Sequence, residues 1–216
     1  MNPVVRAICA GQPVPFRGEE ASAIAKQPLA GPVRITQTGV AGDAQADRKH
    51  HGGPDMALHL YPLDHMAFWR GELGDHPLLA EPGSFGSNIA VHGQDEMQVH
   101  IGDRFRLGTA LIEVSQPRQP CWKIAHRFGD PKMVRRIVQT ARCGWYFRVL
   151  EEGTAQAGDV LHLVEQGQGS MTVARCFGAI WGHPRQDRAD TLRAIVAVPA
   201  LADKLRGQVA DILAGR

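Results

Sequence analysis

The residues best suited to chemistry lie in the segment QPRQPCWK, which ends at Lys123. Pro117 and Pro120 each fix a backbone φ angle and remove a donor, so this stretch is stiff and non-helical. Positive charge stabilises a thiolate, so Arg118 and Lys123 favour the ionised form of Cys121. A thiolate is either a nucleophile or a ligand for a soft metal. The ordinary alternative for a free cysteine is a small buried hydrophobe.

A second candidate is the glycine-rich loop of residues 39–55, which holds two adjacent histidines. Consecutive side chains of an extended chain point to opposite sides, so His50 and His51 are poorly placed to chelate one ion together. The sequence has no HExxH pattern and no second ligand pair at zinc spacing. We interpret the loop as an anion site, where glycines expose backbone amides and Arg48 and Lys49 add charge. The alternative is a glycine-rich turn with a solvated charge run.

Composition limits the classes of protein to consider. The chain has 216 residues, of which 44% are apolar and 21% charged, enough for one domain with an appendage or two small domains. A net charge of +2 argues against dedicated nucleic-acid binding and leaves room for a local cationic pocket. The apolar run 4–10 is too short for a signal or membrane helix. The four cysteines form no CxxC pair, which favours a reduced, cytoplasmic protein.

Around these loops, apolar residues alternate with polar ones in short runs separated by glycine-containing turns. This pattern predicts half-buried strands and indicates a closed or nearly closed β-barrel. The expected strands lie at residues 56–60, 97–101, 105–107, 110–114, 145–150 and 160–164. Two helices should interrupt them. One is expected to begin at Pro62, and the other to begin at Asp130 and end at Gly144.

The last fifty residues have a different character. The segment QGQGS at 166–170 reads as a linker, and the apolar spacing after it predicts three amphipathic helices, the third beginning at Pro199. We therefore expect a barrel domain at 1–165 and a three-helix domain at 170–216. Such a small bundle must bury its apolar faces against something. The sequence allows four roles for the bundle: it packs on the barrel, closes the mouth of the pocket, forms a homodimer with a second copy or docks a reductase.

Taken together, the motifs resemble one family. The HHGG loop, the sequence GSFGSN at 83–88, IGD at 101–103 and QPRQPCWK follow the order of the MOSC domain (molybdenum cofactor sulfurase C-terminal domain). The helical tail is similar to that of the YiiM-like subgroup, so the resemblance covers nearly the whole chain. The second motif usually carries Glu where this chain has Ser87, which puts any role of that carboxylate in doubt here.

The resemblance implies a barrel that binds a mononuclear molybdenum–pyranopterin cofactor, with Cys121 as the protein ligand to the metal. Thiolate is a soft ligand suited to such a centre. His50 or His51 is the candidate proton donor, with a structural histidine as the alternative, and core packing is the alternative for Phe85. The residues expected to contact the cofactor are Asp47, Arg48, Lys49, Gly52, Gly53, Phe85, Asn88, Arg118 and Lys123.

The resemblance also implies an activity. Proteins of this type reduce N-hydroxylated bases and related N-oxygenated compounds, such as 6-hydroxylaminopurine, and so detoxify them. The electrons would come from a separate flavin or iron–sulfur reductase, since the sequence has no GxGxxG and no cluster-type cysteine spacing. One alternative is a non-catalytic carrier of the cofactor or a sulfur-transfer protein using Cys121. Another is a thiol hydrolase with Cys121 as the nucleophile.

Overall fold

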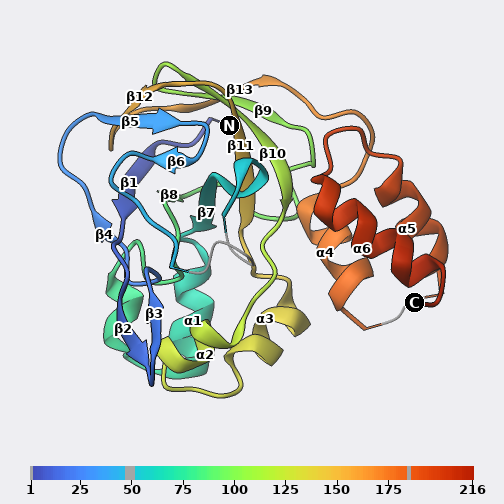
Figure 1. The fold of residues 1–216 in the computed structure, drawn as a ribbon, viewed down its shortest axis with the longest axis horizontal. Helices are drawn as coiled ribbons and strands as arrows, with labels where there is room; N and C mark the ends of the chain where they lie inside the picture. The colour runs from blue at the N-terminus through green and yellow to red at the C-terminus, as the bar shows by residue number, and fades with distance from the viewer. Residues whose placement is uncertain (1, 47–51, 184–185) are drawn as a thin grey trace.

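The computed structural model describes residues 2–46, 52–183 and 186–216. Its main feature is an eight-stranded sheet that curls into a half-barrel (Figure 1), and neighbouring strands are antiparallel except β7 and β8. The mostly-β, barrel-type fold predicted from the sequence is therefore confirmed. In spatial order the strands are β13 (Leu161–Glu165), β9 (Arg104–Leu107), β10 (Ala110–Pro117), β11 (Trp145–Glu151), β7 (Leu58–Pro62), β8 (Ile89–Val91), β1 (Val5–Ala10) and β4 (Gln27–Pro28).

Smaller elements accompany this sheet. A separate hairpin of β2 (Val14–Arg17) and β3 (Glu20–Ser22) packs on a short helix, α2 (Trp122–Arg127), where the ring centroids of Phe16 and His126 are 4.7 Å apart. The remaining short elements are β12 (Gly153–Ala155), β5 (Val33–Thr36), β6 (Gly39–Val40) and the 3-10 turns η1 (Pro54–Met56) and η2 (Pro77–Ala80).

The alternating pattern predicts the long hairpin of β9 and β10 correctly. Phe105 and Leu107 point into the core, while Arg104 and Arg106, which alternate with them, stay partly exposed. Gly108 allows the tight turn, because its φ of +57° favours glycine. Phe105 meets Phe147 of β11 edge to face, with centroids 5.9 Å apart, so the two rings pack together in the core over β10.

The prediction of a strand at residues 97–101 is wrong. That segment forms turns, and Met97 is 71% exposed. The backbone amide of Met97 donates to Asp95 Oδ1 (2.9 Å), and the amide of His100 donates to Asp103 Oδ2 (2.8 Å). Side-chain carboxylates therefore capture amides that a strand would have used in its ladder.

Helices α1 (His65–Leu73), α2 (Trp122–Arg127) and α3 (Met133–Thr140) lie together at one end of the half-barrel, at the bottom of Figure 1. Three predicted boundaries are wrong, and one of them is the start of α3, which lies at Met133 and not at Asp130. Pro62 ends β7 and does not begin a helix. Helix α3 ends with Ala141 in the left-handed conformation, whereas Gly144 is needed for close packing, because a Cβ there would lie 2.3 Å from the carbonyl oxygen of Leu60.

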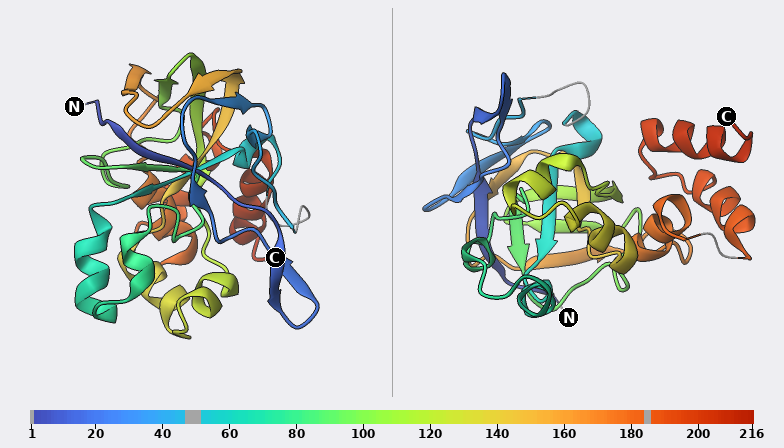
Figure 2. Two further views of the ribbon diagram at one scale, coloured as in Figure 1. Left: turned by 90° about the vertical axis from the view of Figure 1, so that its left-hand side faces the viewer. Right: turned by 90° about the horizontal axis from the view of Figure 1, so that it is seen from below.

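The three C-terminal helices α4 (Val173–Trp181), α5 (Arg188–Val196) and α6 (Asp203–Leu213) lie beside the half-barrel (Figures 1 and 2). We call them the tail. The third begins at Asp203, so the start predicted at Pro199 is wrong. The division of the chain into a barrel domain and a tail domain stays a prediction. Among the residues that the structure describes, no helix combines the length and apolarity needed to cross a membrane.

Candidate active site

Cys121 lies at a corner of the chain, between the end of β10 and the first residue of α2. Its backbone is extended (φ −121°, ψ 169°), and Trp122 begins the helix directly after it. The amide of Arg118 donates to the carbonyl of Gly144 (3.1 Å), which ties the segment before the cysteine to the start of β11. Cys121 is partly exposed and lines two connected hollows, so it is not sealed in apolar packing.

The first hollow, which we call the inner pocket, is a cavity of about 90 Å³ with cationic walls. Lys26, Arg118 and Lys123 all line it, and each is no more than 7% exposed. Lys26 pairs with Asp43. Within the described part of the chain, no carboxylate forms an ion pair with Arg118 or Lys123. Buried charges without partners are costly, so this pocket is suited to an anion.

Asp43 and Asn88 form the frame of the inner pocket. Asp43 accepts hydrogen bonds from the Gly11 amide (2.8 Å) and from Asn88 Nδ2 (2.9 Å), besides its pairing with Lys26. Asn88 Nδ2 also donates to the carbonyl of Cys9 (3.1 Å), and Asn88 Oδ1 accepts from the amide of His59 (3.1 Å). Asn88 therefore joins β1, β7 and the loop before residue 47, and its amide group is used within the protein.

His59 lines the same pocket as a neutral side chain. Its burial, together with the nearby charge of Arg118, lowers its pKa from 6.5 to about 3. Its ring lies 5.2 Å from that of Tyr146. Burial raises the pKa of Tyr146, and the charge of Arg118 opposes this shift. Neither ring adds negative charge near neutral pH, so the pocket keeps its cationic character.

The second motif supplies packing around the pocket. Phe85 is 1% exposed and stacks on Tyr61 with centroids 4.0 Å apart, so most of its surface belongs to the core although its edge lines the pocket. The hydroxyl of Ser87 donates to the carbonyl of Pro82 (3.1 Å), and Ser87 is not among the residues that line either hollow. At this position the side chain contributes no charge to the site.

Only part of the HHGG loop can be placed. Asp47, Arg48, Lys49, His50 and His51 lie outside the described residues, so their predicted roles stay predictions. Gly52 and Gly53 have φ angles of +93° and +95°, which favour glycine. Gly52 borders both hollows and Gly53 borders the second.

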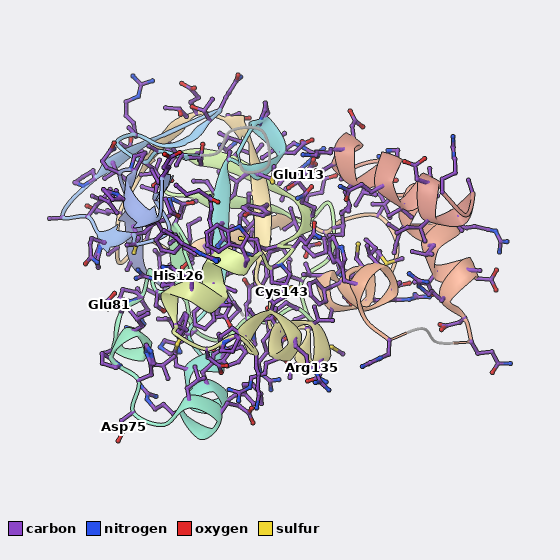
Figure 3. The ribbon with its side chains drawn as sticks, turned by 60° about the horizontal axis from the view of Figure 1, so that its bottom comes forward. Asp75, Glu81, Glu113, His126, Arg135 and Cys143 are labelled. Carbon is purple, nitrogen blue, oxygen red and sulfur yellow. The ribbon has the colours of Figure 1, made fainter. Side chains whose placement is uncertain are left out.

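The far end of this loop is anchored at Asp55. Its carboxylate pairs with Arg148 (2.8 Å), and its carbonyl accepts a hydrogen bond from the hydroxyl of Ser115. Arg148 also pairs with Glu113 (2.6 Å), which lies on the side of the half-barrel that faces the tail (Figure 3). The loop that reaches the pocket is therefore fixed to β10 and β11 at its last residues.

The second hollow, which we call the outer groove, has a volume of about 750 Å³. It shares Cys121, Lys123 and Tyr146 with the inner pocket, so the two are continuous at the thiol. One of its walls comes from the barrel and the other from the tail. A ligand in the groove can therefore reach the cysteine from outside the inner pocket, with Lys123 bordering both hollows.

The structure thus brings together Gly52, Phe85, Asn88, Arg118, Cys121 and Lys123 around one pocket, while Gly53 borders only the groove. Sequence reasoning missed Lys26, Asp43, His59 and Tyr146. Asp43 belongs to the quoted loop but received no role. Alternation in β7 marks Leu58 and Leu60 as buried and leaves His59 on the opposite face, yet all five residues of this strand are buried.

A curled, mostly-β half-barrel with a partly exposed thiol beside buried cations defines the class of the protein. The model of the MOSC domain matches residues 47–162, more than half of the chain. This chain therefore belongs to the MOSC domain family.

Individual relatives agree with this assignment. The chain is 45% identical over 150 residues to the uncharacterized protein YflK of Bacillus subtilis, covering 69% of this chain and 66% of YflK. It is 38% identical over 166 residues to the protein YiiM of Escherichia coli, covering 77% and 74%. A protein of Gibberella moniliformis named Reductase is 42% identical over 150 residues, which is 69% of this chain and only 27% of that protein.

Similarity to a solved structure extends over the tail. The crystal structure of YiiM from Geobacillus stearothermophilus matches with a TM-score of 0.81 and 33% identity, covering 98% of this chain and 99% of that one. The C-terminal helices are thus part of the shared fold. The MOSC domain is associated with a molybdenum cofactor, and one of the relatives is named a reductase.

Proposed function

We propose that the protein is a molybdenum-cofactor-dependent reductase of N-hydroxylated bases and related N-oxygenated compounds, with Cys121 as the protein ligand to the metal. The observation that carries the proposal is the position of this thiol. It lies beside two buried cations without ion-pair partners and opens onto a groove large enough for a substrate. A carrier would need the cationic pocket, but it would not need access from the groove.

The chemistry of the available ligands fits such a cofactor. Within the described ranges, no group of three His, Cys, Asp or Glu residues is placed to hold a metal ion. A metal bound here through Cys121 would take further ligands from the cofactor, as the sulfurs of a pyranopterin dithiolene would provide. The buried charges of Arg118 and Lys123 are suited to an anionic cofactor with a phosphate group. The site contains a soft ligand and matching charge.

The residues of the chain have separable tasks in this scheme. The bound cofactor would supply two-electron chemistry, so that R–NHOH, two electrons and two protons give R–NH2 and water. Arg118 and Lys123 would hold the anionic phosphate of the cofactor, and Cys121 would be the protein ligand to its metal. His59 is neutral near pH 7 and does not compete as a cation. The protons would come from water in the groove or from His50 or His51, whose role remains a proposal.

The electrons would come from a separate flavin or iron–sulfur reductase. The relative named Reductase supports this, because the matched region takes up only 27% of that protein and leaves room for further modules in the same chain. In this protein the equivalent partner would bind transiently. A homodimer and a cytoplasmic location remain expectations from the sequence.

The test compares cofactor content with activity. Protein made in a host that synthesises the cofactor should contain molybdenum and pterin, and with a chemical electron donor it should reduce 6-hydroxylaminopurine to adenine. Cys121→Ala should abolish this activity, whereas Cys176→Ala, which removes a buried thiol of the tail, should not. Bound cofactor without turnover would identify a carrier. Full activity in Cys121→Ala would overturn the proposal.

A second pair of variants tests whether the positive charge of Lys123 helps to bind the cofactor. Lys123→Met removes one buried cation while keeping the side chain's length, and we expect it to lower molybdenum and pterin content per protein. Lys132→Met removes an exposed cation beside α3 and should leave the content unchanged. Equal cofactor content in both variants would show that the buried charge does not hold the cofactor.

A further inference from the structure

The tail forms one wall of the outer groove. Trp181, the last residue of α4, borders the groove together with Leu205 and Gln208 of α6. The barrel contributes the opposite wall, which begins at Cys121. The groove therefore exists only where the two parts of the chain meet, and its size and chemistry depend on the tail.

Hydrogen bonds hold this wall in position. The amide of Ala202 donates to the carbonyl of Ser115 in β10 (3.1 Å), and Arg148 of β11 donates to the carbonyl of Ala200 (2.8 Å). Arg206 then donates to the carbonyl of Leu201 (3.0 Å) and so fixes the turn that precedes α6. Because β10 ends and β11 begins near the thiol, the wall is placed at a set position relative to the cysteine.

The two walls present aromatic and apolar surface to each other. On the barrel side Trp122 is 37% exposed and Tyr146 is half-buried, and the guanidinium of Arg17 lies 5.3 Å from the centre of the Trp122 ring. On the tail side the ring of Trp181 packs against Phe177 with centroids 5.2 Å apart. A solvent-accessible surface lined by indole and phenol rings favours a planar aromatic ligand, because the ligand buries its apolar faces against these rings while its polar edges remain hydrated.

We infer that Trp181 and Leu205 of the tail are specificity-determining residues, which contact the ring of a planar heteroaromatic substrate while its N–OH group faces Cys121. This inference rests on the proposed function. The groove volume of about 750 Å³ is large enough for a bicyclic base. An N-hydroxylated compound without a ring needs only the end of the groove near the thiol, so the tail should not affect its reduction.

The experiment compares two substrates in the holoenzyme. Trp181→Ala removes part of the wall and should raise KM for 6-hydroxylaminopurine about tenfold, as expected for loss of an aromatic contact, with little change in kcat. Its kcat/KM for hydroxylamine, which has no ring, should stay within about twofold of wild type. A loss of kcat/KM for the purine alone indicates a lost contact with the ring, whereas a general loss of structure would lower kcat/KM for both substrates.

A bulky substitution tests the same wall without removing packing. Gln208→Trp adds an indole at an exposed position that borders the groove, and it should lower kcat/KM for the purine more than for hydroxylamine. Ala210→Trp adds the same indole to an exposed position of α6 outside the groove and should behave as wild type. Purine kinetics equal to wild type in both Trp181→Ala and Gln208→Trp would overturn the inference and leave the proposed function intact.

Equilibrium binding distinguishes a failure of the proposed function from a failure of the inference about the tail. Calorimetric titration with adenine, the expected product, needs no electron donor and reports on the groove alone. Binding should weaken about tenfold in Trp181→Ala and remain unchanged in Ala210→Trp. If the wild type reduces neither substrate, the proposed function fails. The titration then decides the inference by itself, and equal affinity in wild type and Trp181→Ala would overturn it.

Discussion

The neutral, buried histidine of the inner pocket makes the protein sensitive to acid in a calculable way. Burial and the charge of Arg118 lower the pKa of His59 from 6.5 to about 3 in the folded protein. In the unfolded chain the imidazole regains its ordinary pKa. Between pH 6.5 and about pH 3 the unfolded state therefore binds a proton that the folded state does not bind, and the free energy of unfolding falls as the pH falls.

The size of the effect follows from the width of this window. Well below pH 6.5, each further pH unit lowers the free energy of unfolding by about 1.4 kcal/mol through this residue alone, until the folded pKa of about 3 is approached. Because the unfolded imidazole is already half protonated at pH 6.5, the loss between pH 6.5 and about pH 4.5 is roughly 2 kcal/mol, a sizeable fraction of the roughly 5–15 kcal/mol typical of a folded protein. Other groups titrate in the same range, so the contribution of His59 must be isolated by difference.

Urea unfolding at several pH values measures this contribution. His59→Gln cannot gain a proton, so its stability should fall less steeply than that of the wild type, whatever its absolute stability. His162→Gln replaces an exposed histidine of β13 and serves as the matched control, whose pH profile should follow the wild type. Parallel profiles for His59→Gln and wild type between pH 6.5 and 4.5 would refute the reasoning.

Three further predictions concern the frame around the site. Asp43→Ala should lower the free energy of unfolding by about 3–5 kcal/mol, because it leaves the buried ammonium of Lys26 without its ion pair. Urea unfolding measures this loss, and Asp211→Ala, at an exposed ion pair, is the control. An equal loss of stability in the two variants would contradict the prediction. Gly144→Ala should reduce Tm strongly, since its Cβ would meet a β7 carbonyl at φ +69°, whereas Gly207→Ala in open space should not. Equal melting of these two variants would count against the close packing. Arg148→Met should speed amide hydrogen exchange in the tail, because it removes the hydrogen bond and ion pairs that link tail, loop and barrel; unchanged exchange would show that this link is dispensable.

The sequence determined the local features of the site and the class of the fold. Prolines and cations around Cys121 indicated a stiff, cationic thiol segment, and the structure places that segment at the corner where β10 meets α2. Alternation predicted β9, β10, β11 and β13, and helical spacing predicted the three helices of the tail. These patterns depend on neighbours within a few residues, so a single sequence is enough to read them.

The tertiary structure decided which residues meet at the pocket. Asn88 hydrogen-bonds to Asp43, 45 residues away, and to Cys9, 79 residues away. The burial of His59 depends on the pairing of β7 with β8 and β11, which no local pattern reports. The second wall of the groove likewise requires the tail to dock on β10 and β11. Contacts between distant segments arise only when the sheet curls, and periodicity along the chain carries no information about them.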